Sequence, residues 1–176
     1  TKENITLSSN LSVDKMTYEG CSLGDISTEF VYIPQEDGSH YLDAVLFSEG
    51  SQVGSLIGTY HPSGKGVLNA DLKLEHLPMK IVNGFIPQQL FGFEGYADGS
   101  MKVRGELSKP HVDGEVFLDS MYMVSVPYGV KLRFSDDPVR VVDSKLMLEN
   151  FEVFGHNDNP LNIYGNINFA DLDNVY

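Results

Sequence analysis

The residues best placed for chemistry include a serine between two glycines. Residues 20–24 read Gly-Cys-Ser-Leu-Gly, which matches the G-x-S-x-G pattern that puts a nucleophilic serine on a sharp turn between a strand and a helix. The segment after Ser22, residues 26–32, is rich in β-branched and aromatic side chains and predicts a strand instead of a helix. We therefore interpret this short motif as a chance match, and we expect no catalytic residues and no enzymatic activity.

Metal ligation is the second chemistry to consider, and the spacing of the ligand-type residues does not support it. The histidines at positions 40, 61, 76, 111 and 156 share no i, i+4 spacing, and Cys21 is the single cysteine. Zinc sites use cysteine pairs or closely spaced histidines, and calcium-binding hand loops need a glycine and a terminal glutamate that the acidic stretches here lack. We expect polar turns and surface histidines, and we predict no metal and no cofactor.

The net charge of the chain restricts the kinds of molecule that it can bind. Among its 176 residues, 12 are Lys or Arg and 25 are Asp or Glu, which gives a formal net charge of −13. Nucleic acids and anionic membrane surfaces attract basic patches, and the basic residues here are scattered. We therefore predict no nucleic-acid partner. No apolar stretch approaches the roughly 18 residues that a membrane-spanning helix requires.

The elements that must position any site are β-strands. The chain has four alanines, at positions 44, 70, 97 and 170, against 44 residues of Val, Ile, Phe and Tyr. β-Branched and aromatic side chains favour the pleated surface of a sheet, whereas alanine is the best helix former. The 17 glycines and 8 prolines interrupt the chain at short intervals, as turns between strands require. We predict an all-β fold.

Alternation of apolar and polar residues is strongest in the second half of the chain. Residues 70–75, 101–107 and 161–169 place apolar side chains at every second position. A period of two puts those side chains on one face of each strand. We expect this face to point toward an apolar interior, which is either the lining of a groove or a closed structural core. The residues predicted to face it are Leu72, Leu74, Met101, Val103, Leu107, Val116, Leu118, Ile163, Ile167 and Phe169.

One strand pattern changes its parity part of the way along. Leu146 and Leu148 lie on one parity, whereas Phe151 and Val153 lie on the other. A shift by one residue turns every later side chain to the opposite face of a strand. The pattern therefore predicts a β-bulge or a turn near residues 149–150.

One segment breaks the β pattern. Residues 77–84 are largely apolar, with Pro78 close to their start and Gly84 at their end. Proline is favoured in the first turn of a helix and glycine just after its last turn. We predict a short helix near residues 78–84 that packs on the sheet or closes one end of its interior.

Many amphipathic strands in series can cover their apolar faces in two ways. A curved sheet or solenoid leaves a continuous apolar groove that suits acyl chains. A closed two-sheet sandwich instead buries the apolar faces against each other. The periodicity is the same in both architectures, so both stay open at this point.

A phrase in the middle of the chain resembles the TamB family, which is related to the AsmA-like proteins. Residues 99–116 read Gly-x-Met-x-Val-x-Gly-x-Leu-x-x-Pro-x-x-x-Gly-x-Val, similar to that family's G-x-L-x-V-x-G-T-L-x-x-P-x-x-x-G-x-V. The Leu-Pro-Met of residues 77–79 precedes this phrase and the segments 126–151 and 159–165 come after it, in the family's order. The resemblance is best over residues 65–173.

The resemblance implies that residues 1–176 are a single segment of a longer periplasmic protein of a Gram-negative envelope, anchored in the inner membrane. The family is associated with outer-membrane protein assembly and with phospholipid movement between membranes. The resemblance implies an antiparallel sheet folded lengthwise, like a taco, with an apolar groove inside. The implied groove partners are acyl chains of phospholipids or amphipathic β-strands, and the full-length protein is expected to pair with an outer-membrane barrel assembly protein. An envelope adhesion or glycan-binding β-sandwich, suggested by nine tyrosines and many turns, is the alternative.

Overall fold

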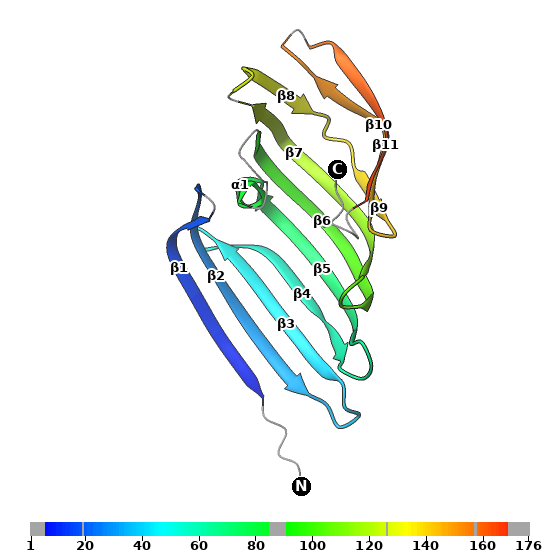
Figure 1. Cartoon of the computed structure of the whole chain (residues 1–176). Helices are drawn as coiled ribbons and strands as arrows, with labels where there is room; N and C mark the ends of the chain where they lie inside the picture. The colour runs from blue at the N-terminus through cyan, green and yellow to red at the C-terminus, as the bar shows by residue number, and fades with distance from the viewer. Residues whose placement is uncertain (1–5, 19, 85–90, 126, 157, 169–176) are drawn as a thin grey trace.

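The protein is almost entirely β-sheet, which confirms the all-β prediction. The computed structural model in Figure 1 describes residues 6–18, 20–84, 91–125, 127–156 and 158–168. They form one antiparallel sheet of 11 strands and one short helix, α1 (Lys80–Asn83), which lies within the predicted residues 78–84. The strands are β1 (Leu7–Tyr18), β2 (Cys21–Pro34), β3 (His40–Ser48), β4 (Ser51–His61), β5 (Val67–Pro78), β6 (Gly92–Glu106), β7 (His111–Ser125), β8 (Val130–Phe134), β9 (Val139–Val142), β10 (Lys145–Phe154) and β11 (Pro160–Asn168).

The strands follow one another across the sheet in nearly the order of the chain. Strands β1 to β8 are neighbours in sequence order, and β10 and β11 complete the sheet. Strand β9 shares the place of β8, because β8 pairs with residues 122–125 of β7 and β9 pairs with residues 114–116. The described strands form a single sheet and not the two packed sheets of a sandwich. The apolar face of this sheet must therefore be sheltered by its curvature.

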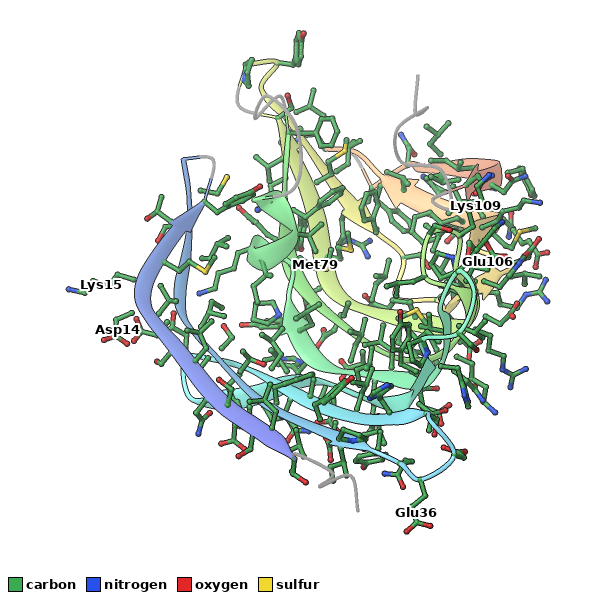
Figure 2. The ribbon with its side chains drawn as sticks, turned by 60° about the horizontal axis from the view of Figure 1, so that its bottom comes forward. Asp14, Lys15, Glu36, Met79, Glu106 and Lys109 are labelled. Atoms are coloured by element: carbon green, nitrogen blue, oxygen red, sulfur yellow. The ribbon has the colours of Figure 1, made fainter. Side chains whose placement is uncertain are left out.

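Helix α1 shows in which sense the sheet curves. The helix contacts β2, β5 and β6, although β3, β4 and β5 separate β2 from β6 in the sheet. Four strand spacings of about 4.8 Å cover roughly 19 Å on a flat sheet, more than a helix of roughly 10–12 Å diameter can bridge. The sheet therefore bends around α1, and Figure 2 shows its U-shaped cross-section with Met79 inside.

The concave side of the sheet is its apolar side. Val82 of α1 packs on this side, where Met79 forms a buried cluster with Ala97 and Met121. A second buried cluster around Ala70 continues the same face away from α1, because paired residues of neighbouring strands point the same way. We call this apolar concave face the trough; its residues include Phe30, Tyr32, Leu42, Ala44, Leu46, Leu56, Tyr60, Leu68, Ala70, Leu72, Leu74, Ala97, Met101, Val103, Val112, Val116, Leu118, Leu146, Leu148 and Ile163.

Two of the long strands bend where a residue adopts a left-handed conformation. Lys15 in β1 (φ 50°) and His76 in β5 (φ 51°) interrupt the pairing registers of their strands. Lys15 N donates to Asp25 Oδ1 at 2.8 Å, and His76 N donates to Asp98 Oδ1 at 2.7 Å, each acceptor lying on the neighbouring strand. A β-bulge increases the local bend and twist of a sheet, so these carboxylates stabilise the curvature.

The bulge predicted near residues 149–150 is confirmed. Asn150 has φ 57°, and the register between β10 and β11 shifts between Leu148 and Phe151. The shift lets Leu146 and Leu148 pack in the same cluster as Phe151 despite their opposite parity. The parity change in the sequence thus records a bend of the strand and not a change of face.

The close approach of β4 to β5 gives a test of this packing. A Cβ at Gly58 would lie 2.4 Å from Asn69 O and 2.5 Å from Ala70 Cα, whereas a Cβ at Gly155 would meet nothing within 4 Å. Gly58→Ala is expected to lower the free energy of unfolding by about 1–3 kcal/mol, because the backbone of β5 must move. The control Gly155→Ala is expected to change it by less than about 0.5 kcal/mol. Urea denaturation measures both variants, and equal stabilities would contradict the close approach.

Candidate functional site: an open apolar trough

Much of the trough is accessible to solvent, because no second layer of the described residues covers it. Leu42, Leu56, Leu72 and Leu118 are only half-buried, although all four point to the concave side. The chain exposes 11471 Å², whereas a compact protein of 19.5 kDa exposes roughly 8,500 Å². The open concave face of the single curved sheet contributes to this excess.

Helix α1 occupies the trough at the end where β5 leads into β6. The Asn83 side chain fixes it there, since Nδ2 donates to Phe93 O at 2.9 Å and Phe93 N donates to Oδ1 at 2.6 Å. On the opposite wall, Cys21 Sγ donates to Asn83 O at 3.5 Å, and the nearby Leu23 is 2% exposed. The helix thus joins the two walls and fills part of the cross-section at this end.

An aromatic row lines the opposite end of the trough. The rings of Tyr32 and His40 stack with their centroids 4.9 Å apart, and the Tyr60 ring lies 6.3 Å beyond His40. Phe30 extends the row on the Tyr32 side, with a centroid distance of 6.4 Å. Gly66 makes room for the last ring, because a Cβ there would lie 2.5 Å from the Tyr60 hydroxyl oxygen. This end therefore offers broad ring surfaces to an apolar ligand.

Eight of the predicted interior residues belong to the trough. Leu72 and Leu74 lie on β5, and the pairing registers place the residues of β6 and β7 on the same face. Ile163 packs in the cluster formed by β9 and β10, and Ile167 pairs with Leu146 on the same face, where it is 51% exposed because β11 is an edge strand. The eight residues are Leu72, Leu74, Met101, Val103, Val116, Leu118, Ile163 and Ile167.

The other two predicted residues are not placed in the trough. Leu107 is in the turn after β6 and is 57% exposed, because the pairing of β6 with β5 ends at Glu106 and the left-handed Gly105 (φ 101°) redirects the chain. Phe169 lies outside the described residues.

The strands β2, β3 and β4 form a large part of the trough that the alternation did not identify. Their convex face also carries apolar side chains, including Val31, Val45 and Ile57, and these obscure the period of two. A usable signal was the aromatic spacing of Phe30 and Tyr32, which places both rings on one face of a strand. The residues of β3 and β4 that extend this row are set by the strand register, which cannot be read from the sequence.

The motifs considered for catalysis and metal binding do not assemble into a site among the described residues. Ser22 lies within β2, so the turn from strand to helix that a nucleophile elbow needs is not formed there. Within the same described ranges, no group of three or more His, Cys, Asp or Glu residues has the geometry to hold a metal ion. The described part of the chain also contains no helix with the length and apolarity needed to cross a bilayer.

The convex face of the second half of the sheet is charged. Lys73 donates a hydrogen bond to Glu75 and lowers the pKa of that carboxyl group, and Arg140 forms a two-oxygen contact of 2.6 Å with Glu149. The hydrogen bond between His111 and Asp143 likewise holds the pKa of Asp143 below its ordinary value. These exposed pairs keep one face in water while the other stays apolar, so the sheet is amphipathic across its thickness.

Comparisons with known proteins give no match. No protein-family model matches the chain, and neither the search of curated proteins nor the search of solved structures finds a similar protein. The class of protein is therefore defined by the fold and the site, as a single curved antiparallel sheet around an open apolar trough.

The attachment of α1 to the trough can be tested through Asn83. Asn83→Ala removes two hydrogen bonds and leaves the backbone of Phe93 unsatisfied in a half-buried place, so we expect a loss of about 1–3 kcal/mol in the free energy of unfolding. The control Asn69→Ala, on the exposed convex face of β5, is expected to cost less than about 0.5 kcal/mol. Hydrogen exchange should also become faster in α1 of the Asn83 variant. Unchanged exchange there would contradict the anchoring role.

Proposed function

We propose that this chain is a non-enzymatic segment of a TamB-like periplasmic envelope protein, and that its trough holds acyl chains of phospholipids during transport between membranes. The observation that carries the proposal is the half-exposed apolar face that crosses the sheet from β2 to β10. A small binding site for a polar ligand would not need an extended apolar face. An acyl chain needs one, because its binding free energy becomes more favourable by roughly 25 cal/mol for each Å² of apolar surface removed from water.

The dimensions of the trough support this occupant. Strand β6 has 15 residues, which at about 3.3 Å per residue corresponds to roughly 50 Å of sheet before bending. An apolar face that runs along strands of this length suits extended chains better than a folded protein domain.

Strand β1 supports a second use of the same segment, which is to hold amphipathic β-strands of outer-membrane proteins. It is an edge strand of 12 residues, and all but one of them are exposed. Leu7 and Leu11 continue the apolar parity, with exposures of 55% and 61%. An exposed edge with this alternation is a template for an added strand. The adhesion or glycan-binding alternative predicted a closed sandwich, whereas the described strands form a single sheet.

Two neighbouring residues of β4 provide a matched test of acyl-chain binding. Leu56 is a half-buried residue of the trough, and Ile57 points to the convex face and is 46% exposed. Leu56→Glu is expected to weaken binding of a fluorescent fatty-acyl phospholipid by at least about tenfold, because a carboxylate would have to be desolvated beside the chain. Ile57→Glu adds the same charge on the other face and should leave binding within about twofold.

A second variant keeps this test decisive where Leu56→Glu alters the fold. Ala44→Phe adds apolar volume to the trough without adding charge, and we expect it to reduce the number of bound chains per protein molecule. Circular dichroism checks that each variant retains its sheet. Equal lipid binding by Leu56→Glu, Ala44→Phe and Ile57→Glu would contradict the proposal.

A further inference from the structure

The sheet has a notch beside α1. Strand β4 pairs with β5 only as far as Gly54 and Leu74, whereas β5 continues to Pro78. The space left between the β3–β4 turn and the end of β5 has a volume of about 560 Å³. Its lining includes Ser48, Val53, Lys80, Phe93 and Glu94.

The notch leads from a charged rim to the trough. On the rim, Lys80 Nζ lies 3.3 Å from Glu49 Oε1, and both side chains are about half exposed. Gly24 leaves the space for this pair, because a Cβ there would lie 2.0 Å from Glu49 Oε1. On the inner side, Phe93 packs against the buried cluster of Met79 and Ala97 in the trough. A molecule seated here would meet charges at one end and apolar side chains at the other.

A buried hydroxyl group in the lining is without a partner. Ser48 is 3% exposed, and its Oγ atom has no hydrogen-bond partner among the described residues. Buried hydroxyl groups in folded proteins are nearly always hydrogen-bonded, and an unsatisfied one points to a ligand or to water. Its place in the lining of the notch makes a ligand oxygen a suitable acceptor for this hydroxyl.

We propose that the notch is a lateral entrance to the trough that seats the headgroup of a zwitterionic phospholipid carrying a primary ammonium. This inference rests on the proposed function and adds the class of lipid and the place of its entry. The phosphate contacts Lys80 Nζ and accepts a hydrogen bond from Ser48 Oγ. The ammonium contacts the Glu49 carboxylate, and the acyl chains pass Phe93 into the trough.

Charge complementarity favours a zwitterion over an anion. The rim pair Lys80 and Glu49 supplies one positive and one negative side chain, whereas the Glu94 carboxylate is already paired with Lys131 at 3.0 Å. A zwitterion finds an opposite charge for each of its own groups, whereas an anionic headgroup would leave the Glu49 carboxylate facing a like charge. The formal net charge of −13 adds to this repulsion.

The test compares short-chain phosphatidylethanolamine with phosphatidylglycerol of identical acyl chains, by isothermal titration calorimetry on the whole chain. The native protein is expected to bind phosphatidylethanolamine about fivefold more tightly. Glu49→Lys should reverse this preference, because the rim then carries two ammonium groups. The control Glu106→Lys makes the same charge change in another exposed pair, Lys65–Glu106, which also has an N–O distance of 3.3 Å. It should keep the native preference.

Ser48→Ala adds a readout that a purely structural role would not produce. Removing an unpartnered hydroxyl should leave the melting temperature of the lipid-free protein unchanged or higher, while binding of phosphatidylethanolamine weakens about threefold to tenfold. A lower melting temperature together with unchanged binding would overturn the role of Ser48 in the notch.

The remaining outcomes separate this inference from the proposed function. Equal affinities for the two lipids, or the same shift in Glu49→Lys and Glu106→Lys, would overturn the headgroup seat and leave acyl-chain binding standing. No binding of either lipid would overturn both. Free phosphoethanolamine is expected not to displace the bound lipid at equal concentration. Displacement would identify the notch as a site for a small phosphorylated amine and would overturn its role as a lipid entrance.

Discussion

A hydrogen bond between a backbone amide and a carboxylate of the next strand holds the bends of this sheet. Lys15 and His76 adopt left-handed conformations that leave their N–H groups outside the regular ladder, and Asp25 and Asp98 accept them. Both N–H groups are exposed, so without the carboxylate they would bond to water, and the bulge would lose its side-chain link to the neighbouring strand. The bends allow one sheet to wrap its own apolar face around α1, so the shape of the trough depends on these contacts. Part of the acidity of the chain therefore serves its curvature.

The two faces of the sheet explain how one segment combines an apolar lining with a high net charge. The convex face of the second half carries ion pairs such as Arg140–Glu149, while the concave face carries Leu72 and its neighbours. The charged pairs keep the outside in water, and the curvature limits the exposure of the inside. A conduit for acyl chains needs this division along its whole length. The Asn83 contacts and the notch beside Lys80 place polar groups at the α1 end of the interior.

The sequence predicted the second half of the fold better than the first, for a physical reason. In β5 to β7 the convex positions are charged, so the period of two is clear and residues such as Met101 and Val116 were identified correctly as facing the interior side of the sheet. In β2 to β4 both faces carry apolar side chains, and strand register alone decides which face lines the trough. The bulge at Asn150 was predictable because it reversed a parity. The notch could not be predicted from the sequence, because it arises where β4 stops pairing with β5.

Occupation of the trough by acyl chains is tested most directly by site-specific photocrosslinking at two adjacent positions of β5. A photoreactive residue at Leu72 lies in the trough, and one at Asp71 lies on the exposed convex face of the same strand. Each variant would be mixed with phospholipid vesicles carrying a radiolabelled headgroup and then irradiated. Lipid attached at position 72 and absent at position 71 is the predicted result. Equal labelling of the two positions, or labelling at position 71 alone, would contradict acyl-chain binding in the trough.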